Sequence, residues 1–152
     1  MNELRGQVAL VTGASRGIGA VIARCLGEAG ANVGVNFSSD RDGANEVSEE
    51  IKAGGSESII LQGDVSVETE AELIVKQTTE QWGQIDILVN NAGITKDGLL
   101  LRMKAEDWDR VIDVDLRGAF LCSKYVMPHM IRRRQGRIIN ISSVVGIGGN
   151  VG

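Results

Sequence analysis

The sequence predicts an α/β fold of the Rossmann type, in which a doubly wound parallel sheet lies between two layers of helices (three layers, α/β/α). Short runs of consecutive apolar residues, typical of strands covered on both faces, alternate along the chain with stretches of helical period. A glycine-rich turn follows the first run, and polar residues follow several of the others. We expect a single domain over residues 1–152, truncated after the fifth strand of such a fold.

The first expected strand, 8–11, leads into the turn Thr12-Gly13-Ala14-Ser15-Arg16-Gly17-Ile18-Gly19. Glycines permit tight turning there and a close approach of backbone N–H groups to a pyrophosphate, and the start of the following helix adds a partial positive charge. The pattern therefore predicts a dinucleotide site. The apolar positions of the helix that the turn opens are Ile18, Ile22, Leu26 and Ala29.

Four further strands are expected, each after a helix that ends at glycine, a residue that accepts the left-handed conformation at a helix C-terminus. These strands span 31–35, 58–61, 85–89 and 137–141. The glycines before them are Gly30, Gly54 with Gly55, Gly83 and Gly136.

Apolar residues at helical spacing predict three more helices between these strands. The first begins at Asp40 or Asp42 as N-cap and buries Ala44, Val47 and Ile51. The second begins at Ser66, and its stripe consists of Ala71, Ile74, Val75, Thr78 and Trp82. The third is longer, from about 105 to 135, with Trp108, Val111, Ile112 and Ala119 facing inward.

Composition narrows the classes of function. A net charge of −4 argues against nucleic acid, whose binding requires a clustered cationic surface. The N-terminus lacks an apolar signal segment and no run approaches membrane-spanning length, so we expect a cytoplasmic protein without membrane contact.

Cys25 and Cys122 are interpreted as reduced, semi-buried side chains on separate helices. His129 is the single histidine, so no metal-ligand spacing occurs and no metal is expected.

Polar residues follow three further strands. Asp64-Val65 follows the third, Asn90-Asn91-Ala92-Gly93 the fourth and Ser142-Ser143 the fifth. Because the carboxyl ends of parallel strands meet at one edge of a sheet, we expect these residues to face the same crevice as the glycine turn.

With these motifs the chain resembles the classical short-chain dehydrogenase/reductase family from about Leu4 to Gly152, and within it the 3-oxoacyl-carrier-protein reductases of fatty acid synthesis. The family's cofactor motif T-G-x-x-x-G-x-G corresponds to 12–19, and its N-N-A-G motif to 90–93. The cofactor-binding residues that the resemblance implies are Thr12, Gly13, Ser15, Arg16, Gly17, Ile18, Gly19, Phe37, Ser38, Asp64, Val65, Asn91, Ala92 and Gly93.

The family transfers a hydride between a nicotinamide and a carbonyl. The resemblance implies that Ser143 positions the substrate oxygen, whereas the Tyr-x-x-x-Lys pair that protonates it in the family is expected after Gly152. Asp115 aligns with the family's asparagine, whose main chain supports a relay water, and the change to a carboxylate departs from the pattern. Tyr125, four residues before His129 in the middle of a helix, is interpreted as a packing residue.

The end of the second strand bears on the cofactor. Relatives that prefer NAD carry an acidic residue there for the ribose hydroxyls, but 36–39 reads Asn-Phe-Ser-Ser. Arg16, in the phosphate loop, can meet the 2′-phosphate of NADP or remain a solvated loop charge. We expect NADP.

Arg132, Arg133 and Arg134 close the long helix. Cations are favoured at a helix C-terminus by the macrodipole, and in the carrier-protein reductases basic residues near this helix end dock the acidic acyl carrier protein. Both interpretations stay open. Family members also pair this helix across a subunit interface, usually in tetramers, so a homo-oligomer is expected.

The leading hypothesis is the N-terminal part of an NADPH-dependent reductase that converts a 3-oxoacyl thioester, on acyl carrier protein or CoA, to the 3-hydroxyacyl form. Another short-chain carbonyl reductase or alcohol dehydrogenase is the second hypothesis. A non-catalytic NADP-binding fragment is the third.

Overall fold

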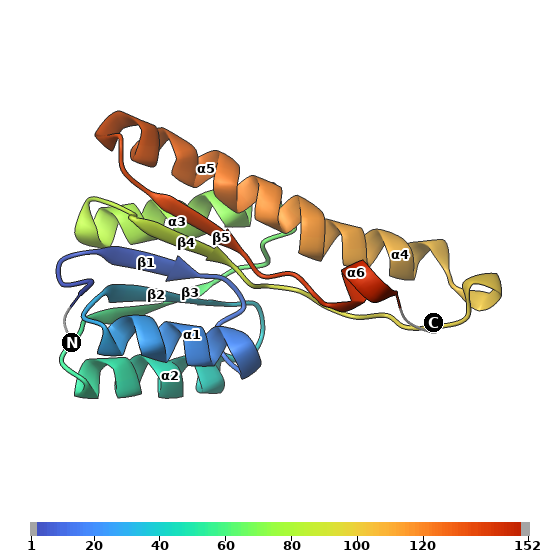
Figure 1. The fold of residues 1–152 in the computed structure, drawn as a ribbon, viewed down its shortest axis with the longest axis horizontal. Coiled ribbons are helices and arrows are strands. Elements are labelled where there is room, and N and C mark those ends of the chain that lie inside the picture. The colour runs from blue at the N-terminus through green and yellow to red at the C-terminus, as the bar shows by residue number, and fades with distance from the viewer. Residues whose placement is uncertain (1–2, 150–152) are drawn as a thin grey trace.

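The computed structural model describes residues 3–149, and over these residues the chain forms one parallel sheet (Figure 1). The strand order is β3-β2-β1-β4-β5, and all four pairings are parallel. The predicted doubly wound sheet is therefore confirmed, whereas the predicted limits at Met1 and Gly152 lie outside the described residues. The strands are β1 (Val8–Val11), β2 (Asn32–Phe37), β3 (Ser58–Gln62), β4 (Ile87–Asn90) and β5 (Arg137–Asn140).

Helices cover both faces of the sheet, as the fold class requires. On one face α1 (Gly17–Glu28) lies beside α2 (Arg41–Ala53), and on the other α3 (Glu68–Trp82) lies beside α5 (Gly118–Arg133). Successive residues of β1 point to opposite faces, so Ala9 and Val11 join the core under α1 and α2, while Leu10 joins the core under α3 and α5. Two separate cores therefore hold the three layers together.

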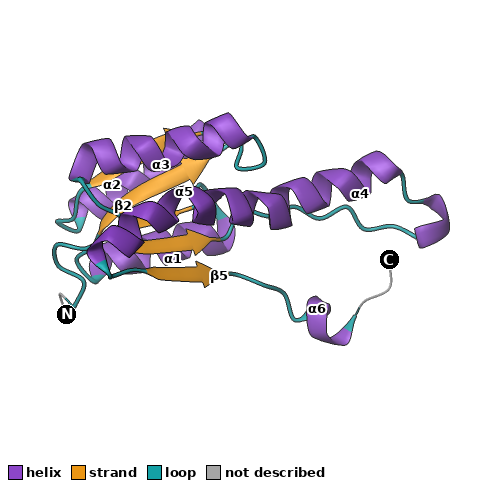
Figure 2. Cartoon of the chain, turned by 90° about the horizontal axis from the view of Figure 1, so that it is seen from above, coloured by secondary structure: helices purple, strands orange, loops and turns teal. Residues whose placement is uncertain are grey.

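The long helix begins well beyond the sheet. It runs from α4 (Ala105–Val111) through a π-helical segment (Ile112–Arg117) into α5, and α4 projects past the strands (Figure 2). Trp108 and Ile112 are exposed, so the prediction that they face inward is wrong; helical period identifies an apolar face but not what covers it. Val111 and Ala119 are half-buried. The buried face consists of Val114, Gly118, Leu121, Cys122, Val126 and Met130.

The starts of the shorter helices are partly as predicted. Asp40 caps α2, where its Oδ1 accepts a hydrogen bond from the Gly43 N–H (3.1 Å). Ser66 does not cap α3, because its N–H and hydroxyl both turn back to the carboxylate of Asp64, and the helix starts at Glu68. Of the apolar positions of α1, Ile18 is exposed at the first turn, whereas Ile22 and Leu26 pack against the core.

Two predictions about single residues need correction. The left-handed residue after α5 is Arg134 (φ 52°), not Gly136, which is required instead because a Cβ there would collide with Met130. Cys25 is exposed rather than semi-buried, while Cys122 is buried and its pKa is raised to about 12 by desolvation. Both thiols are free.

The amino edge of the sheet is held by one buried carboxylate, that of Asp86, which is 3% exposed. Its Oδ2 accepts hydrogen bonds from the Val8 N–H (2.8 Å) and from Gln84 Nε2 (2.9 Å). Its Oδ1 accepts one from Arg133 Nη1 (2.7 Å), which fastens the end of α5 to β1 and β4. The Arg133 side chain is thus held in a structural ion pair with Asp86.

We expect Asp86→Ala to lower the free energy of unfolding by at least about 1–3 kcal/mol, because the buried Val8 N–H is left without a partner. Urea unfolding followed by circular dichroism measures the loss. Glu80→Ala, which removes one member of an exposed pair with Lys76, should leave the midpoint almost unchanged. Equal midpoints for the two variants would contradict the anchoring role of Asp86.

Candidate functional site

A cavity of about 350 Å³ opens at the carboxyl edge of the sheet, where the segments after β1, β2, β3 and β4 meet. Most of the predicted cofactor residues line it, although they come from four separate parts of the sequence. Those in the lining are Gly13, Ser15, Arg16, Ile18, Phe37, Ser38, Asp64, Val65, Asn91, Ala92 and Gly93. The structure therefore brings eleven of the fourteen together.

The other three residues, Thr12, Gly17 and Gly19, lie outside the lining and shape the turn. Gly17 is left-handed (φ 60°) with open space around it, and a Cβ on Gly19 would collide with the side chain of Asn91. Gly13 combines both constraints, since its φ is 61° and a Cβ would lie 2.8 Å from Ala92 Cα. Gly17 is thus favoured by its backbone conformation, Gly19 by close packing, and Gly13 by both.

Thr12 and Asn91 lock this turn to the segment after β4. Thr12 Oγ1 accepts hydrogen bonds from the N–H groups of Asn91 and Ala92, both at 3.0 Å. The Asn91 Nδ2 donates in return to the carbonyls of Thr12 (2.9 Å) and Gly13 (3.0 Å). Two walls of the cavity are therefore one hydrogen-bonded unit.

Asn36 fixes the turn from its other side, and the sequence analysis did not identify it as a site residue. It is 1% exposed, and its Oδ1 accepts from the Gly13 N–H (3.1 Å). Its Nδ2 donates to the carbonyls of Leu61 and Gly63, both at 3.0 Å. A carboxamide between Val35 and Phe37, at the buried end of β2, is the signal that could have found it, because a buried amide requires partners.

The start of α1 suits an anion. Arg16 occupies the N-cap position with extended backbone, and within residues 3–149 no side chain accepts from the first N–H groups of the helix. No acidic residue lies in the first turn. Since Ser15, Arg16 and Ile18 line the cavity, these unpaired N–H groups and the helix dipole favour a phosphate there. The residues present thus fit a dinucleotide cofactor.

The end of β2 supplies a buried ring and two exposed hydroxyls. Phe37 is 1% exposed, with the Arg41 guanidinium 5.4 Å from its ring centroid. Ser38 and Ser39 are exposed and line the cavity. Asp40 also lines it, but its carboxylate is engaged as the cap of α2. The first two cavity-lining positions after β2, Ser38 and Ser39, therefore carry no charge.

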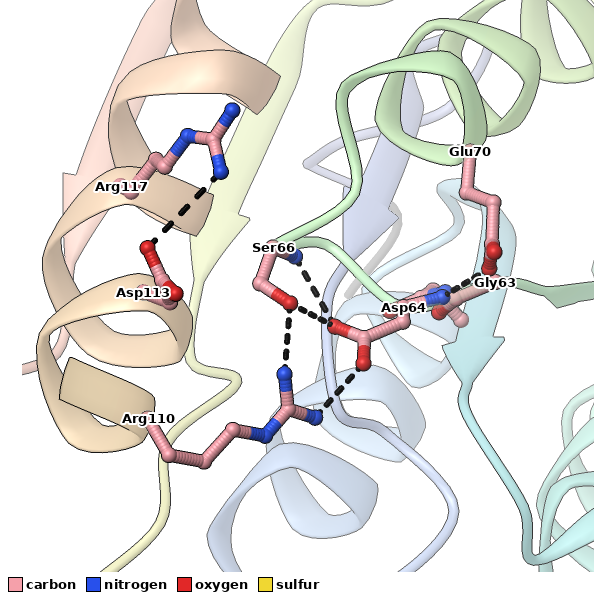
Figure 3. A network of polar contacts seen from close by, with 8 residues as sticks. Gly63, Asp64, Ser66, Glu70, Arg110, Asp113 and Arg117 are labelled. Carbon is pink, nitrogen blue, oxygen red and sulfur yellow. Dashed lines mark hydrogen bonds and ion pairs between the residues drawn. The ribbon is translucent and has the colours of Figure 1, made fainter. Parts of the chain in front are cut away.

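Asp64, after β3, is the centre of a polar network (Figure 3). Its Oδ1 accepts from the N–H (2.9 Å) and the hydroxyl (2.6 Å) of Ser66, and its Oδ2 from Arg110 Nη2 (2.6 Å). Partial burial raises the pKa of Asp64, but the hydrogen bonds from Ser66 and Arg110 outweigh it and hold the pKa below its ordinary value. The carboxyl group is therefore ionised at neutral pH.

The two predicted catalytic residues lie outside the cavity lining. Asp115, in the π segment, stands behind it: its Oδ1 accepts from the Ile94 N–H (2.9 Å), and a Cβ on Gly93 would lie 3.5 Å from its carboxylate. Ser143 is exposed beyond β5, with its Oγ accepting from the Val145 N–H (3.2 Å). The chain leaves the sheet after Ile141 and runs toward α6 (Val145–Gly148), so the expected convergence of all four strand ends fails at Ser142-Ser143.

The contacts of Tyr125 support its interpretation as a packing residue. It packs partly buried against the core under α5, and its hydroxyl donates to Glu68 Oε1 (2.9 Å) on α3. Partial desolvation and the Glu68 carboxylate raise the pKa of Tyr125, which makes the phenol a weaker acid. Lys124 Nζ reaches the same carboxylate (2.7 Å), so the cluster joins two helices.

Residues 3–149 contain neither a candidate metal site nor a candidate membrane-spanning helix. No three His, Cys, Asp or Glu side chains there lie close enough together to hold a metal ion. No helix in the same range combines the length and apolar character that crossing a bilayer requires.

Comparison with known proteins gives concordant matches. A family model described as short chain dehydrogenase matches residues 7–152. The 3-oxoacyl-[acyl-carrier-protein] reductase FabG of Staphylococcus epidermidis is 54% identical over 144 residues, 95% of this chain and 59% of that protein. FabG of Staphylococcus aureus is 52% identical over 95% of this chain and 58% of its own. The 3-oxoacyl-[acyl-carrier-protein] reductase of Synechocystis sp. is 51% identical over the whole chain and 62% of its own. The chain thus spans about three fifths of the length of these relatives.

We expect Asn36→Leu to destabilise the chain by about 1–3 kcal/mol or more, because the Gly13 N–H and two buried carbonyls lose their partner. Chemical unfolding monitored by tryptophan fluorescence measures it. Asn32→Leu in the same strand is the matched control, since Asn32 makes one exposed hydrogen bond to the Glu57 N–H. If both substitutions cost the same, Asn36 does not organise the turn.

Proposed function

We propose, from the premise that this chain belongs to the short-chain dehydrogenase family, that it serves the NADPH-dependent reduction of a 3-oxoacyl thioester on acyl carrier protein. The product is the 3-hydroxyacyl thioester, formed in fatty acid synthesis. Relatives at 51–54% identity carry the name 3-oxoacyl-[acyl-carrier-protein] reductase, which supports this substrate. A CoA thioester presents the same reacting group.

The observation that carries the proposal is the cavity built on the Gly13 turn and the uncapped start of α1. NADPH, when bound, supplies the hydride. In the proposed arrangement the N–H groups at the start of α1 hold the pyrophosphate, and Arg16 with Ser38 meets the 2′-phosphate. The segment 91–93 lines the cavity and would contact the dinucleotide on the side of its nicotinamide.

On the substrate side, Ser143 would donate a hydrogen bond to the carbonyl oxygen of the thioester substrate, where negative charge develops during reduction. Asp115 would act indirectly, because its carboxylate fixes the Ile94 N–H and so the segment after 91–93. A Tyr-x-x-x-Lys sequence, the proton donor and its partner in the family, does not occur in the 152 residues. Tyr125 is not proposed for this task, since its hydroxyl is engaged by Glu68.

A second candidate function is binding of NADP without catalysis, favoured by the exposed position of Ser143 outside the cavity lining. NADPH oxidation by the purified chain, with acetoacetyl-CoA or a 3-oxoacyl carrier protein, separates the candidates. Turnover that depends on the thioester, and falls in Ser143→Ala, supports the reductase. Faster turnover of a simple ketone indicates another carbonyl reductase, and saturable NADPH binding without turnover supports the second candidate.

The carrier protein and a second copy of the chain are the proposed partners, in the cytoplasm. Because Arg133 is held by Asp86, Arg132 and Arg134 would be the cations that meet an acidic carrier. Four exposed apolar side chains recur every four residues along α4, the π segment and α5, and we assign this stripe to contact between copies. They are Trp108, Ile112, Leu116 and Phe120.

We expect the wild-type chain to bind NADPH more tightly than NADH, and Ser38→Asp to weaken NADPH binding roughly tenfold or more, because its carboxylate faces the 2′-phosphate. Ser38 is chosen because Phe37 is buried and an acid there would enter the core. Fluorescence titration with both dinucleotides measures the preference. Gln77→Glu, an exposed change of charge on α3, is the control, and tighter NADH binding by the wild type would contradict the assignment.

We also expect the wild-type chain to be oligomeric and Phe120→Glu to shift it toward the monomer, since a buried unpaired carboxylate opposes association. Multi-angle light scattering over a concentration series reads the mass. Leu73→Glu on α3 is the control, because Leu73 is also exposed but lies off the stripe. A monomeric wild type at all concentrations would refute the assigned contact.

A further inference from the structure

Arg110 links the projecting helix α4 to the cavity. Among the described residues of α4 none is buried, and Arg110 is the one whose side chain lines the cavity. Its guanidinium is a two-pronged donor: Nη2 reaches Asp64 Oδ2 (2.6 Å) and Nη1 reaches Ser66 Oγ (2.8 Å). Figure 3 shows both prongs directed at the segment after β3.

Asp64 retains one free acceptor position. Its Oδ1 takes two hydrogen bonds from Ser66, and its Oδ2 takes one from Arg110. A carboxylate offers about four lone-pair positions, so one on Oδ2 remains. The side chain of Asp64 is 25% exposed and lines the cavity, and a ligand N–H can therefore reach it.

The proposed function indicates which part of NADPH would lie near Asp64. With the pyrophosphate at the start of α1 and the ribose at Ser38, after β2, the base extends toward the next strand end, that of β3. Adenine carries one exocyclic amine, which can donate to a carboxylate, whereas a 6-oxo base presents an acceptor oxygen at the same position.

Resting on that proposed function, we infer that Arg110 is a positioning residue: it orients the Asp64 carboxylate to accept from the adenine amine and so ties base recognition to helix α4. A bidentate guanidinium fixes direction as well as charge, which a lysine in the same place does not. Ser66 completes the arrangement, since it donates to Asp64 while accepting from Arg110.

The test compares NADPH with nicotinamide hypoxanthine dinucleotide phosphate, in which a 6-oxo group replaces the amine, by fluorescence titration of the full chain. A charge-assisted hydrogen bond predicts that the wild type prefers NADPH by about tenfold or more. Arg110→Met should reduce this preference to about threefold or less, with Arg110→Lys in between. A loss of preference is a readout that general destabilisation of the chain would not produce.

Arg117→Met is the matched control, because Arg117 lies on the same helical run but pairs with Asp113 (3.8 Å) and lies outside the cavity lining. It should retain the wild-type preference. Wild-type preference in Arg110→Met, or no preference in the wild type, would overturn the inference and leave the cofactor proposal intact. Failure of the wild type to bind either dinucleotide would overturn both. If Arg110→Met does not fold, the ratio in Arg110→Lys decides the matter.

Discussion

The structure depends on how the backbone of the Gly13 turn is held between two asparagine side chains. Asn36 reaches it from β2 and Asn91 from the segment after β4. The Thr12 hydroxyl donates to the Val89 carbonyl of β4 and accepts from the Asn91 N–H. Because no side chain fits at Gly13 or Gly19, the turn packs directly on Ala92 and Asn91. The position of α1, and with it the uncapped N–H groups at the cavity, follows from this packing.

The predictable part of this fold is the part that local patterns determine. Continuous apolar runs gave the strands to within a few residues, and an aspartate before an amphipathic stretch gave the cap of α2. Burial on the long helix was predicted wrongly at Trp108, because period does not reveal that the sheet ends first. The pairing of Arg110 with Asp64 could not be predicted from the sequence, because no pattern around Arg110 indicates a partner 46 positions away.

The cavity and the candidate catalytic residues are organised to different degrees. Most residues assigned to the cofactor line one cavity, and Thr12, Gly13, Asn91 and Ala92 among the assigned residues are hydrogen-bonded to one another, whereas Ser143 lies on an exposed segment beyond the edge strand. Asp115 links the long helix to the cavity, because it lies in the π segment and its Oδ1 accepts a hydrogen bond from the N–H of Ile94, which lines the cavity. The π segment that carries Asp115 is a local irregularity of a kind often found at functional sites.

That π segment also sets the phase of the long helix. In an unbroken α-helix, the twelve positions from Trp108 to Phe120 rotate by about 1200°, roughly 120° past three full turns. One residue absorbed by the wider winding reduces the excess to about 20°, which keeps the apolar stripe on one side. Deleting a single residue there would swing α4 by about 100° and carry Arg110 away from Asp64. One extra residue in the π segment therefore sets the direction of two faces of the long helix, the exposed apolar stripe and the face that carries Arg110.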